Sequence, residues 1–452
     1  MFLAGKSKES YCGMKVLWVL NLMPPALGEQ LGKECSVKEG WISGLLGKLV
    51  EEEAAKEITL GICYPVTAKE EEKREEIRLS NENIICYGFC EDSIRSELYE
   101  EKVLMERFQE IFTDFEPELL HVFGTEYGHT LAAVKAFGRP KRTLIGLQGI
   151  ISACAKEYLA DLPGQVYRKN SFRDWLKQDG MLKQQEKFAI RGEREKAALI
   201  YTGNVTGRTD FDRKAVEKLN EHVCYFFMNE TLRPEFYSGS WSRKSCIPHR
   251  IFFSQADYPL KGFHYLLQSM PVVKRSFPDV TIAVAGNSLV KEETLKDRIK
   301  LSAYGKYLKQ LIREAGMEER VTFLGKLSAE EMKEEYLKCQ TFVCASSLEN
   351  SPNSLGEAMC LGVPVVASGT GGIPSMLEDG KEGLLFPKGN VKALGRTLVR
   401  LWKDPSLEDE LSRQGAVRAK RTHDGEKNFS RLLEIYQEIC KEGDLGKGRE
   451  GS

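Results

Sequence analysis

The chain has 452 residues, an apolar content of 42% and a formal net charge of −1. This length exceeds one average domain, so two domains are expected. A net charge near zero provides no global positive field, which argues against a nucleic-acid-binding protein. No apolar run approaches the roughly 20 residues of a membrane span. The twelve cysteines lack the paired spacing of a zinc site and are typical of a reduced, cytoplasmic protein.

The first half of the chain alternates strand-like runs with helical ones. After thirteen polar, patternless residues, strands are predicted at 15–20, 58–63, 83–88, 119–124, 143–148 and 198–203. The apolar run at 16–23 also has features of a signal peptide, but Pro24 and Pro25 interrupt it and no small-x-small cleavage site follows. We therefore expect a first Rossmann strand there and an amino-terminal Rossmann-like domain over residues 14–229.

The second half repeats this alternation. Strands are predicted at 250–254, 280–286, 320–325, 341–346, 364–368 and 383–386. Alternation of this kind predicts parallel sheets covered by helices on both faces, hence an α/β fold of two Rossmann-like domains facing each other across a cleft. The second domain is expected over 250–424, after a linker at 230–249 rich in Gly, Pro, Ser and aromatics. A terminal helix at 425–441 either crosses back to the first domain or covers the second sheet.

The most informative stretch of the sequence runs from 344 to 376. Glu349 follows the predicted strand 341–346, and Glu357 comes after seven further residues, inside a helix that Ser351 is expected to cap. Ligands of open α/β sheets bind beyond the carboxyl ends of strands, and a helix start attracts an anion. Carboxylates on both sides of a phosphate site suit sugar hydroxyls. The spacing alone fits an ordinary βαβ unit with solvated glutamates equally well.

The surrounding residues carry a more specific pattern. Glu357 opens EAMCLGVPVVAS (357–368), GGIP (371–374) follows, and KGFHYLLQSMP (261–271) and RVTFLGKLSAEEM (320–332) come before. This pattern resembles the nucleotide-sugar signature of the family 4 retaining glycosyltransferases of GT-B architecture, over roughly residues 248–390. It is similar in pattern to bacterial capsular and exopolysaccharide enzymes. The resemblance implies sugar transfer from a nucleotide diphosphate sugar to an acceptor hydroxyl, with retention at the anomeric carbon.

The resemblance also implies roles for individual residues. Glu349 would be catalytic and favour positive charge on the transferred sugar, Glu357 would hold ribose hydroxyls, and Lys261 would neutralise the diphosphate. The remaining donor-binding positions are Asn353, Ser354, Leu355, Gly371 and Gly372. The family has an arginine five residues before Lys261, where this chain has Ala256, so Gln255 is the expected neutral substitute.

Candidates in the first half of the chain follow its predicted strands. Glu126 and His129 lie beyond the strand at 119–124 and are expected to face the cleft, where they would orient or deprotonate an acceptor hydroxyl. A helix cap with a hydrogen-bonded histidine explains them equally well. Gly28 is a candidate for close backbone approach to the donor. Arg208 and Asp210 are candidate acceptor contacts, although a capped helix start also explains Asp210.

The sequence further limits cofactors. No Asp-x-Asp motif ends a strand, so we expect no metal and no cofactor, with a UDP- or GDP-sugar as donor substrate. The segment GTGGIP (369–374) lacks the third glycine of a dinucleotide fingerprint, which disfavours an oxidoreductase. A sugar-nucleotide epimerase or phosphorylase of the same architecture, or a non-catalytic nucleotide-sugar-binding subunit, stays open as an alternative.

The expected partners are the donor and a lipid-linked or saccharide acceptor. Residues 168–196 hold nine Lys or Arg and five Asp or Glu, with aromatic side chains between them. Such a stretch is typical of an amphipathic helix packed on its own domain or of one lying on an anionic membrane. We therefore expect a cytoplasmic protein, with peripheral contact to the inner membrane face as the second alternative.

Overall fold

The computed structural model describes residues 13–33, 40–51, 58–79, 82–91, 100–292 and 294–445. The strands are β1 (Met14–Val19), β2 (Ile58–Val66), β3 (Arg74–Leu79), β4 (Glu82–Cys90), β5 (Leu119–Phe123), β6 (Thr143–Gly146), β7 (Asn204–Gly207), β8 (Cys224–Phe227), β9 (Arg250–Phe253), β10 (Thr281–Val284), β11 (Val321–Phe323), β12 (Thr341–Cys344), β13 (Val365–Ser368) and β14 (Leu384–Phe386). The expectation for the first thirteen residues lies, apart from Gly13, outside these ranges.

The helices of the first half are α1 (Pro25–Leu31), α2 (Gly40–Glu51), α3 (Glu101–Phe115), α4 (Gly128–Phe137), α5 (Ile151–Glu157), α6 (Gly164–Tyr167), α7 (Phe172–Lys177), α8 (Met181–Ile200) and α9 (Asp210–Leu219). Those of the second half are α10 (Phe263–Lys274), α11 (Leu295–Lys300), α12 (Ala303–Glu314), α13 (Ala329–Lys338), α14 (Asn353–Cys360), α15 (Ile373–Met376), α16 (Val391–Lys403), α17 (Pro405–Thr422) and α18 (Gly425–Leu445). Single-turn helices are η2 (Lys69–Glu71), η3 (Pro140–Arg142), η4 (Pro234–Tyr237) and η5 (Pro259–Lys261).

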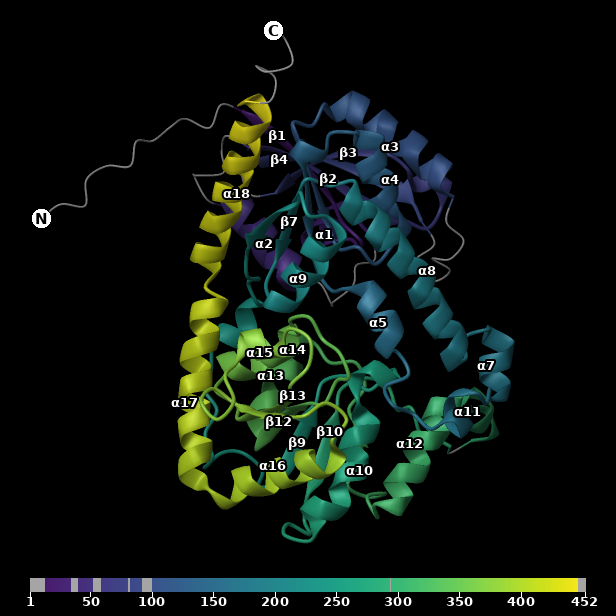
Figure 1. Ribbon diagram of the computed structural model, residues 1–452, viewed down its shortest axis with the longest axis vertical. Helices are drawn as coiled ribbons and strands as arrows, with labels where there is room; N and C mark the ends of the chain where they lie inside the picture. Colours follow the sequence, from purple (N-terminus) through teal and green to yellow (C-terminus); the bar gives the residue numbers. More distant parts are fainter. Residues whose placement is uncertain are drawn as a thin grey trace, which may run out of the picture.

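These elements form two sheets. The first has the order β3-β4-β2-β1-β5-β6-β7-β8 and is parallel except for β3, which pairs with β4 in the antiparallel sense. The second, in the order β11-β10-β9-β12-β13-β14, is parallel throughout. Figure 1 shows the sheets one above the other, each flanked by helices. Because both faces of a parallel sheet are covered, strands such as β5 are buried along their whole length. The expected fold of two Rossmann-like domains is confirmed.

One predicted strand is wrong, and two strands at the edges of the first sheet were not predicted. The run 198–203 is not a strand, because α8 continues to Ile200 and β7 begins only at Asn204. Ala198 and Leu199 are buried on the inner face of α8, and so short an apolar run does not distinguish a helix from a strand. Strands β3 and β8 were not predicted, because they lie at the edges of the sheet and expose part of their side chains.

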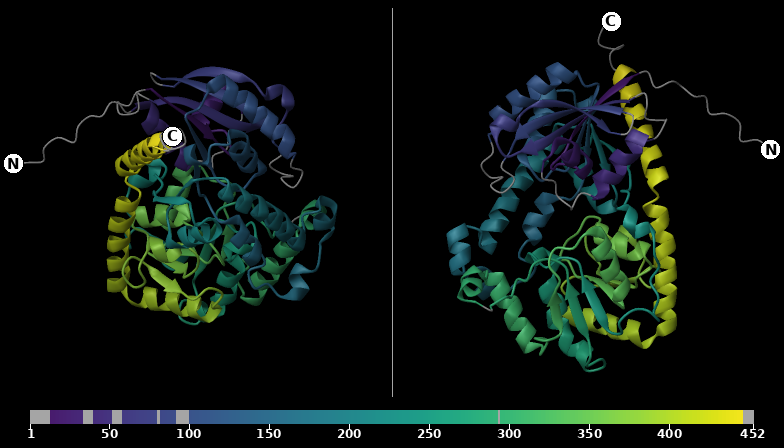
Figure 2. Two further views of the ribbon diagram at one scale, coloured as in Figure 1. Left: turned by 45° about the horizontal axis from the view of Figure 1, so that its top comes forward. Right: turned by 180° about the vertical axis from the view of Figure 1, so that it is seen from behind.

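The last helix lies against the first sheet. Trp18 of β1 donates its indole N–H to the Tyr436 hydroxyl at 2.8 Å, and that hydroxyl lies 2.7 Å from Nδ1 of His121 in β5. Burial lowers the pKa of His121 to about 3, so its ring is neutral in this hydrogen bond. Figures 1 and 2 show α17 and α18 running along one side of both domains. The end of the chain therefore connects the second sheet to the first.

No helix in the described ranges is both long enough and apolar enough to span a membrane. The predicted division of the chain at residues 230–249 stays a prediction.

Tyr436→Phe tests the contribution of α18. The change leaves the Trp18 N–H and the His121 ring nitrogen buried without their partner. We expect the free energy of unfolding to fall by about 1–3 kcal/mol, as for other unsatisfied buried polar groups. Thermal unfolding measures this loss, and Tyr201→Phe, at an exposed ring, is the matched control. Equal melting temperatures for the two variants would contradict the role given to the Tyr436 hydroxyl.

Candidate functional site

The loops that follow β9 and β12 meet at one edge of the second sheet. The two strands are neighbours, so their carboxyl ends lie side by side. Lys261 follows β9 and donates from Nζ to Oε1 of Glu349, which follows β12, at 2.7 Å. Ser346 donates to the same oxygen at 2.7 Å. Burial disfavours the charged ammonium, but the Glu349 carboxylate outweighs burial and raises the pKa of Lys261. The structure thus brings together two of the predicted site residues as an ion pair.

Glycines allow these loops to approach so closely. Gly262 has φ +71°, and a Cβ there would overlap the carbonyl oxygen of Ala345 at the end of β12. Gly371 has φ +53°, and a Cβ there would overlap the carbonyl oxygen of Glu349. Gly372 donates its N–H to that same oxygen at 3.0 Å. The glycine loop therefore supports the Glu349 backbone, and donor binding by Gly371 and Gly372 stays a prediction.

Glu357 lies in a buried ion pair that the sequence did not reveal. One carboxylate oxygen accepts from Nη2 of Arg233 at 2.9 Å, and the other accepts from the Tyr336 hydroxyl at 3.2 Å. Burial raises the pKa of Glu357, and the positive charge of Arg233 opposes that shift. Arg233 comes from the predicted linker, where no motif marks it. The carboxylate expected to hold ribose is thus already oriented by two neighbouring side chains.

The start of α14 offers backbone amides beside Glu349. The helix begins at Asn353 with Pro352 as its N-cap, so the predicted cap at Ser351 is wrong by one position. The first amides of a helix, here those of Asn353 and Ser354, have no carbonyl acceptor within it. Leu355 donates its amide to the Pro352 carbonyl and is fully buried, so it anchors the helix and offers no free N–H. This helix start suits an anion.

The loop before Lys261 lacks a second phosphate-binding group at the expected position. Ala256 is buried in the same apolar core as Phe253 and Phe263, so this position faces the domain interior. Gln255 donates its side-chain amide to the Asp257 carboxylate at 3.1 Å. The amide of Gln255 is therefore engaged beside an acidic group, and its expected contact with a phosphate stays a prediction.

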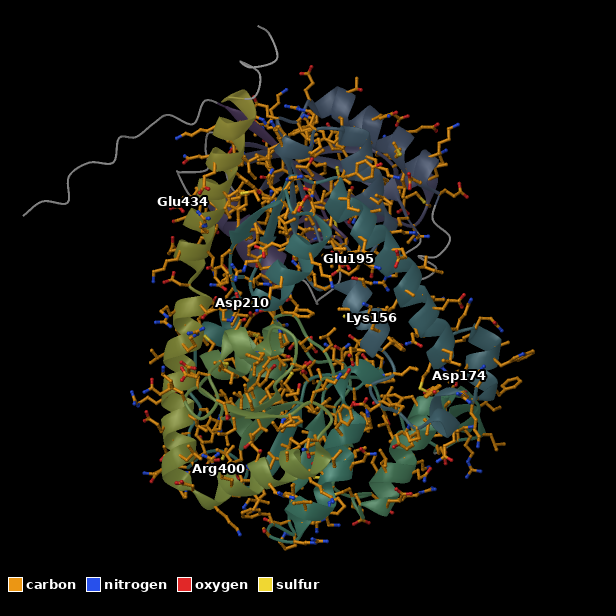
Figure 3. All side chains as sticks on the ribbon, in the orientation of Figure 1. Lys156, Asp174, Glu195, Asp210, Arg400 and Glu434 are labelled. Atoms are coloured by element: carbon orange, nitrogen blue, oxygen red, sulfur yellow. The ribbon has the colours of Figure 1, made fainter. Side chains whose placement is uncertain are left out.

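The first domain faces this site through α5. Burial raises the pKa of the Cys154 thiol to about 12, and the charge of Glu349 adds to this shift. Glu157 at the end of α5 forms an ion pair with Lys388 of the second domain at 2.5 Å, so α5 lies against that domain. Glu195 of α8 accepts from the amides of Ile151 and Ser152 at 2.8 and 2.9 Å, which holds the start of α5. Figure 3 labels Glu195 between α8 and α5.

Direct hydrogen bonds join the two domains beside Glu349. Thr209 donates to the side chain of Asn350 at 2.9 Å, and Ser347 donates to the Glu157 carbonyl at 3.3 Å. The loop that carries Glu349 is therefore in contact with the first domain on both sides of the glutamate.

His129 is oriented by a carboxylate that was not predicted. Its Nδ1 lies 2.5 Å from Oε2 of Glu91, and its backbone N–H donates to the other oxygen at 3.0 Å. Burial opposes the charged form of Glu91, yet the histidine outweighs it and lowers the pKa of Glu91. His129 Nε2 and Glu126 Oε2 are buried with no hydrogen-bond partner among the described residues. Burial raises the pKa of Glu126, which favours its protonated form. Both groups can bind a hydroxyl.

The predicted acceptor residues border a separate opening. Arg208 and Asp210 line a cavity of about 580 Å³ between α9 and the loop of Gly371 and Ser375. Arg208 forms an ion pair with Glu230 and is almost fully buried, so its charge is largely committed within the protein. Asp210 is exposed, and it does not cap α9, because Thr209 does. Figure 3 labels Asp210 near the level where the domains meet.

Gly28 lies in a helical segment after β1. It is inside α1 and donates its amide to the Pro24 carbonyl at 3.0 Å. Close approach of its backbone to the donor stays a prediction. No group of three or more His, Cys, Asp or Glu side chains within the described ranges could hold a metal ion.

Comparison with known proteins agrees with this geometry. The family model described as "Glycosyl transferases group 1" matches residues 247–418. The chain is 29% identical over 195 residues, 43% of its length, to the phosphatidyl-myo-inositol mannosyltransferase of Mycobacterium leprae, and it covers 47% of that protein. It is 26% identical over 180 residues, 39% of its length, to the spore coat protein SA of Bacillus subtilis, and it covers 46% of it. The chain thus spans about half the length of these curated relatives.

Solved structures match over nearly the whole chain. The sucrose-phosphate synthase of Thermosynechococcus elongatus has a TM-score of 0.65 at 14% identity, over 94% of this chain and 99% of that one. The Anabaena protein Alr3699/HepE in complex with UDP-glucose has a TM-score of 0.61 at 16% identity, over 94% and 100%. At these identities the likeness shows the fold, which is the two-domain GT-B architecture.

Gly371→Ala tests the support of the Glu349 loop. Gly380 also has a positive φ, +75°, but open space surrounds its Cβ position. Gly380→Ala should therefore cost about 1–2 kcal/mol of stability for the left-handed backbone alone. Gly371→Ala should cost distinctly more, because the new methyl group overlaps the Glu349 carbonyl. Thermal unfolding of both variants measures the difference, and equal losses would rule out tight packing at Gly371.

Proposed function

We propose that the protein is a retaining glycosyltransferase of family 4 type, which moves a sugar from a nucleotide diphosphate sugar to an acceptor hydroxyl. The observation that carries this proposal is the Lys261–Glu349 ion pair at 2.7 Å, beside the start of α14. A cation and free helix amides suit a diphosphate, and a carboxylate next to them suits a sugar that gains positive charge. The match of residues 247–418 to a glycosyltransferase family supports the same reading.

The donor would lie along the edge formed by β9 and β12. Its diphosphate would accept hydrogen bonds from Lys261 Nζ and from the amides of Asn353 and Ser354, and its ribose would approach Glu357. Lys261 would then do the work that a metal ion does in many other transferases, so no metal is required. One structural neighbour is in complex with UDP-glucose, and one relative is named a GDP-mannose-dependent mannosyltransferase, which supports a UDP- or GDP-sugar.

The transfer step follows from this arrangement. The bond between the anomeric carbon and the phosphate oxygen breaks, and the acceptor oxygen bonds to the same face of that carbon. The acceptor proton passes to the departing phosphate oxygen. The Glu349 carboxylate stabilises positive charge on the sugar ring, an electrostatic role. His129, held by Glu91, would present Nε2 to a hydroxyl, and Glu126, whose pKa burial raises, would form a hydrogen bond beside it.

The acceptor would be a saccharide or a lipid-linked hydroxyl in surface polysaccharide or glycolipid synthesis. The cavity of about 580 Å³ beside Asp210 and Gly371 is large enough for one sugar ring. A lipid-linked acceptor would require work in the cytoplasm at the inner membrane face. Phosphatidyl-inositol is part of the name of two relatives, which supports a lipid acceptor.

Glu349→Gln tests the catalytic role. The amide keeps the shape but removes the charge, so the turnover number should fall by roughly two orders of magnitude, as for other preorganised electrostatic groups. Affinity for the nucleoside diphosphate should stay equal or rise, because Lys261 loses its competing partner. Donor turnover and calorimetry measure the two effects, with the exposed Glu434→Gln as control. An unchanged turnover number would remove Glu349 from the mechanism.

Lys261→Ala tests the diphosphate site. The change should weaken nucleoside diphosphate binding by about 1.5–3 kcal/mol, the worth of a charge-assisted hydrogen bond, and leave the free nucleoside unaffected. Titration calorimetry with both ligands measures this, and Lys244→Ala at an exposed position is the control. Equal losses for both ligands would locate Lys261 away from the diphosphate.

A donor assay separates the rival activities. An epimerase would convert the donor without an acceptor, and a phosphorylase would require inorganic phosphate. A non-catalytic subunit would bind the nucleotide without turnover.

A further inference from the structure

A pair of short helices carries large apolar side chains into solvent. In α7, Phe172, Trp175 and Leu176 are 60%, 62% and 65% exposed. In α11, Leu295 and Ile299 are 77% and 55% exposed. We refer to these five side chains as the apolar tip. Figures 1 and 2 show α7 and α11 side by side on one side of the molecule.

Hydrogen bonds and ion pairs of buried or partly buried side chains fix α7 in position. Asp174 is almost fully buried, closes a capping box with Ser171, and accepts from the amide of Ala303 at 2.8 Å. Arg173 pairs with both Asp174 and Asp179, at 3.0 and 2.8 Å. Helix α7 therefore buries its carboxylate and exposes its apolar side chains, the reverse of a helix that covers its own domain. Figure 3 labels Asp174 on this side of the molecule. Clustered exposed apolar side chains of this kind mark an interaction surface.

Basic side chains outnumber acidic ones around the apolar tip. Lys183 and Glu186 neutralise each other at 2.7 Å. The other exposed cations in the described parts of 168–187 and 291–300 are Arg168, Lys169, Lys177, Lys291, Arg298 and Lys300, and the partly exposed acids are Asp179, Glu292 and Asp297. An apolar surface surrounded by cations is complementary to an anionic lipid bilayer, where each cation adds attraction.

We propose that the apolar tip docks on an anionic lipid bilayer, with its five side chains in the interface and the six cations against the headgroups. The proposal identifies the surface of the expected membrane contact. It rests on the proposed function only for the purpose of that contact. The docking surface differs from the stretch 168–196 expected from the sequence. It combines α7 with α11 from the second half of the chain, and α8 contributes little to it.

A cavity lies between the apolar tip and the candidate site. It has a volume of about 530 Å³ and extends from Asp174 and Lys300 to Tyr158 and Tyr258. The ring of Tyr258 lies 5.8 Å from Lys261 Nζ and is stacked on Tyr158 at 6.4 Å. The head group of a lipid anchored at the tip would therefore lie on the side of this cavity that is away from Lys261.

Vesicle sedimentation of the full chain tests the proposal. We expect binding to vesicles that contain phosphatidylglycerol, little binding to pure phosphatidylcholine, and release at about 1 M salt, where the Debye length is ~3 Å. Two double variants, Trp175→Ser with Leu176→Ser and Leu295→Ser with Ile299→Ser, should each lower partitioning by about tenfold or more through lost apolar burial. Lys177→Glu with Lys300→Glu should lower it on anionic vesicles. Ile200→Ser and Val417→Ser, each at a side chain 60% exposed elsewhere, should leave it unchanged.

Absence of binding to anionic vesicles would overturn the proposal, as would binding that neither double variant weakens. A dimer in light scattering that these variants abolish, without vesicle binding, would make the tip a self-association surface and also overturn it. Calorimetry with a nucleoside diphosphate on the same samples keeps the two claims apart. Vesicle binding without nucleotide binding supports the docking and contradicts the transferase. Nucleotide binding without vesicle binding overturns the docking alone.

Discussion

A buried ion pair between two loops is the interaction on which the site depends. Lys261 and Glu349 lie 2.7 Å apart, and each would be strongly destabilised without the other, because an unpaired charge is costly away from water. The pair requires the loops after β9 and β12 to touch, and Gly262 and Gly371 make that contact sterically allowed. A diphosphate that binds Lys261 would release Glu349 from the ion pair, so that Glu349 could contact the sugar. Without a ligand, the two charged side chains that would contact the donor neutralise each other.

The other charged groups around the site are held by similar means. Arg233 and Tyr336 orient Glu357, and Glu91 orients His129 from the opposite wall. Fixed dipoles and charges of this kind require little reorganisation when charge develops on a substrate. The two walls stay together because Thr209 bonds Asn350 and because α18 lies against the first sheet. Domain contacts and site electrostatics are therefore parts of one arrangement.

The sequence predicts the parallel sheets well, because strands buried on both faces are continuous apolar runs. Edge strands such as β8 are partly exposed and lack that signal. The pattern around Glu349 also identifies Lys261, since both belong to loops at the same sheet edge. Partners such as Arg233 and Glu91 could not be predicted, because pairing across 124 or 38 residues leaves no trace in a single sequence. The apolar tip could not be predicted from the sequence either, since only the fold brings α11 beside α7.

The structure of the protein with a bound nucleoside diphosphate sugar tests the central claim most directly. The account predicts the diphosphate at the start of α14, Lys261 Nζ within hydrogen-bonding distance of a phosphate oxygen, and Glu349 turned to the sugar ring. A diphosphate bound elsewhere, with the Lys261–Glu349 ion pair intact, would contradict it.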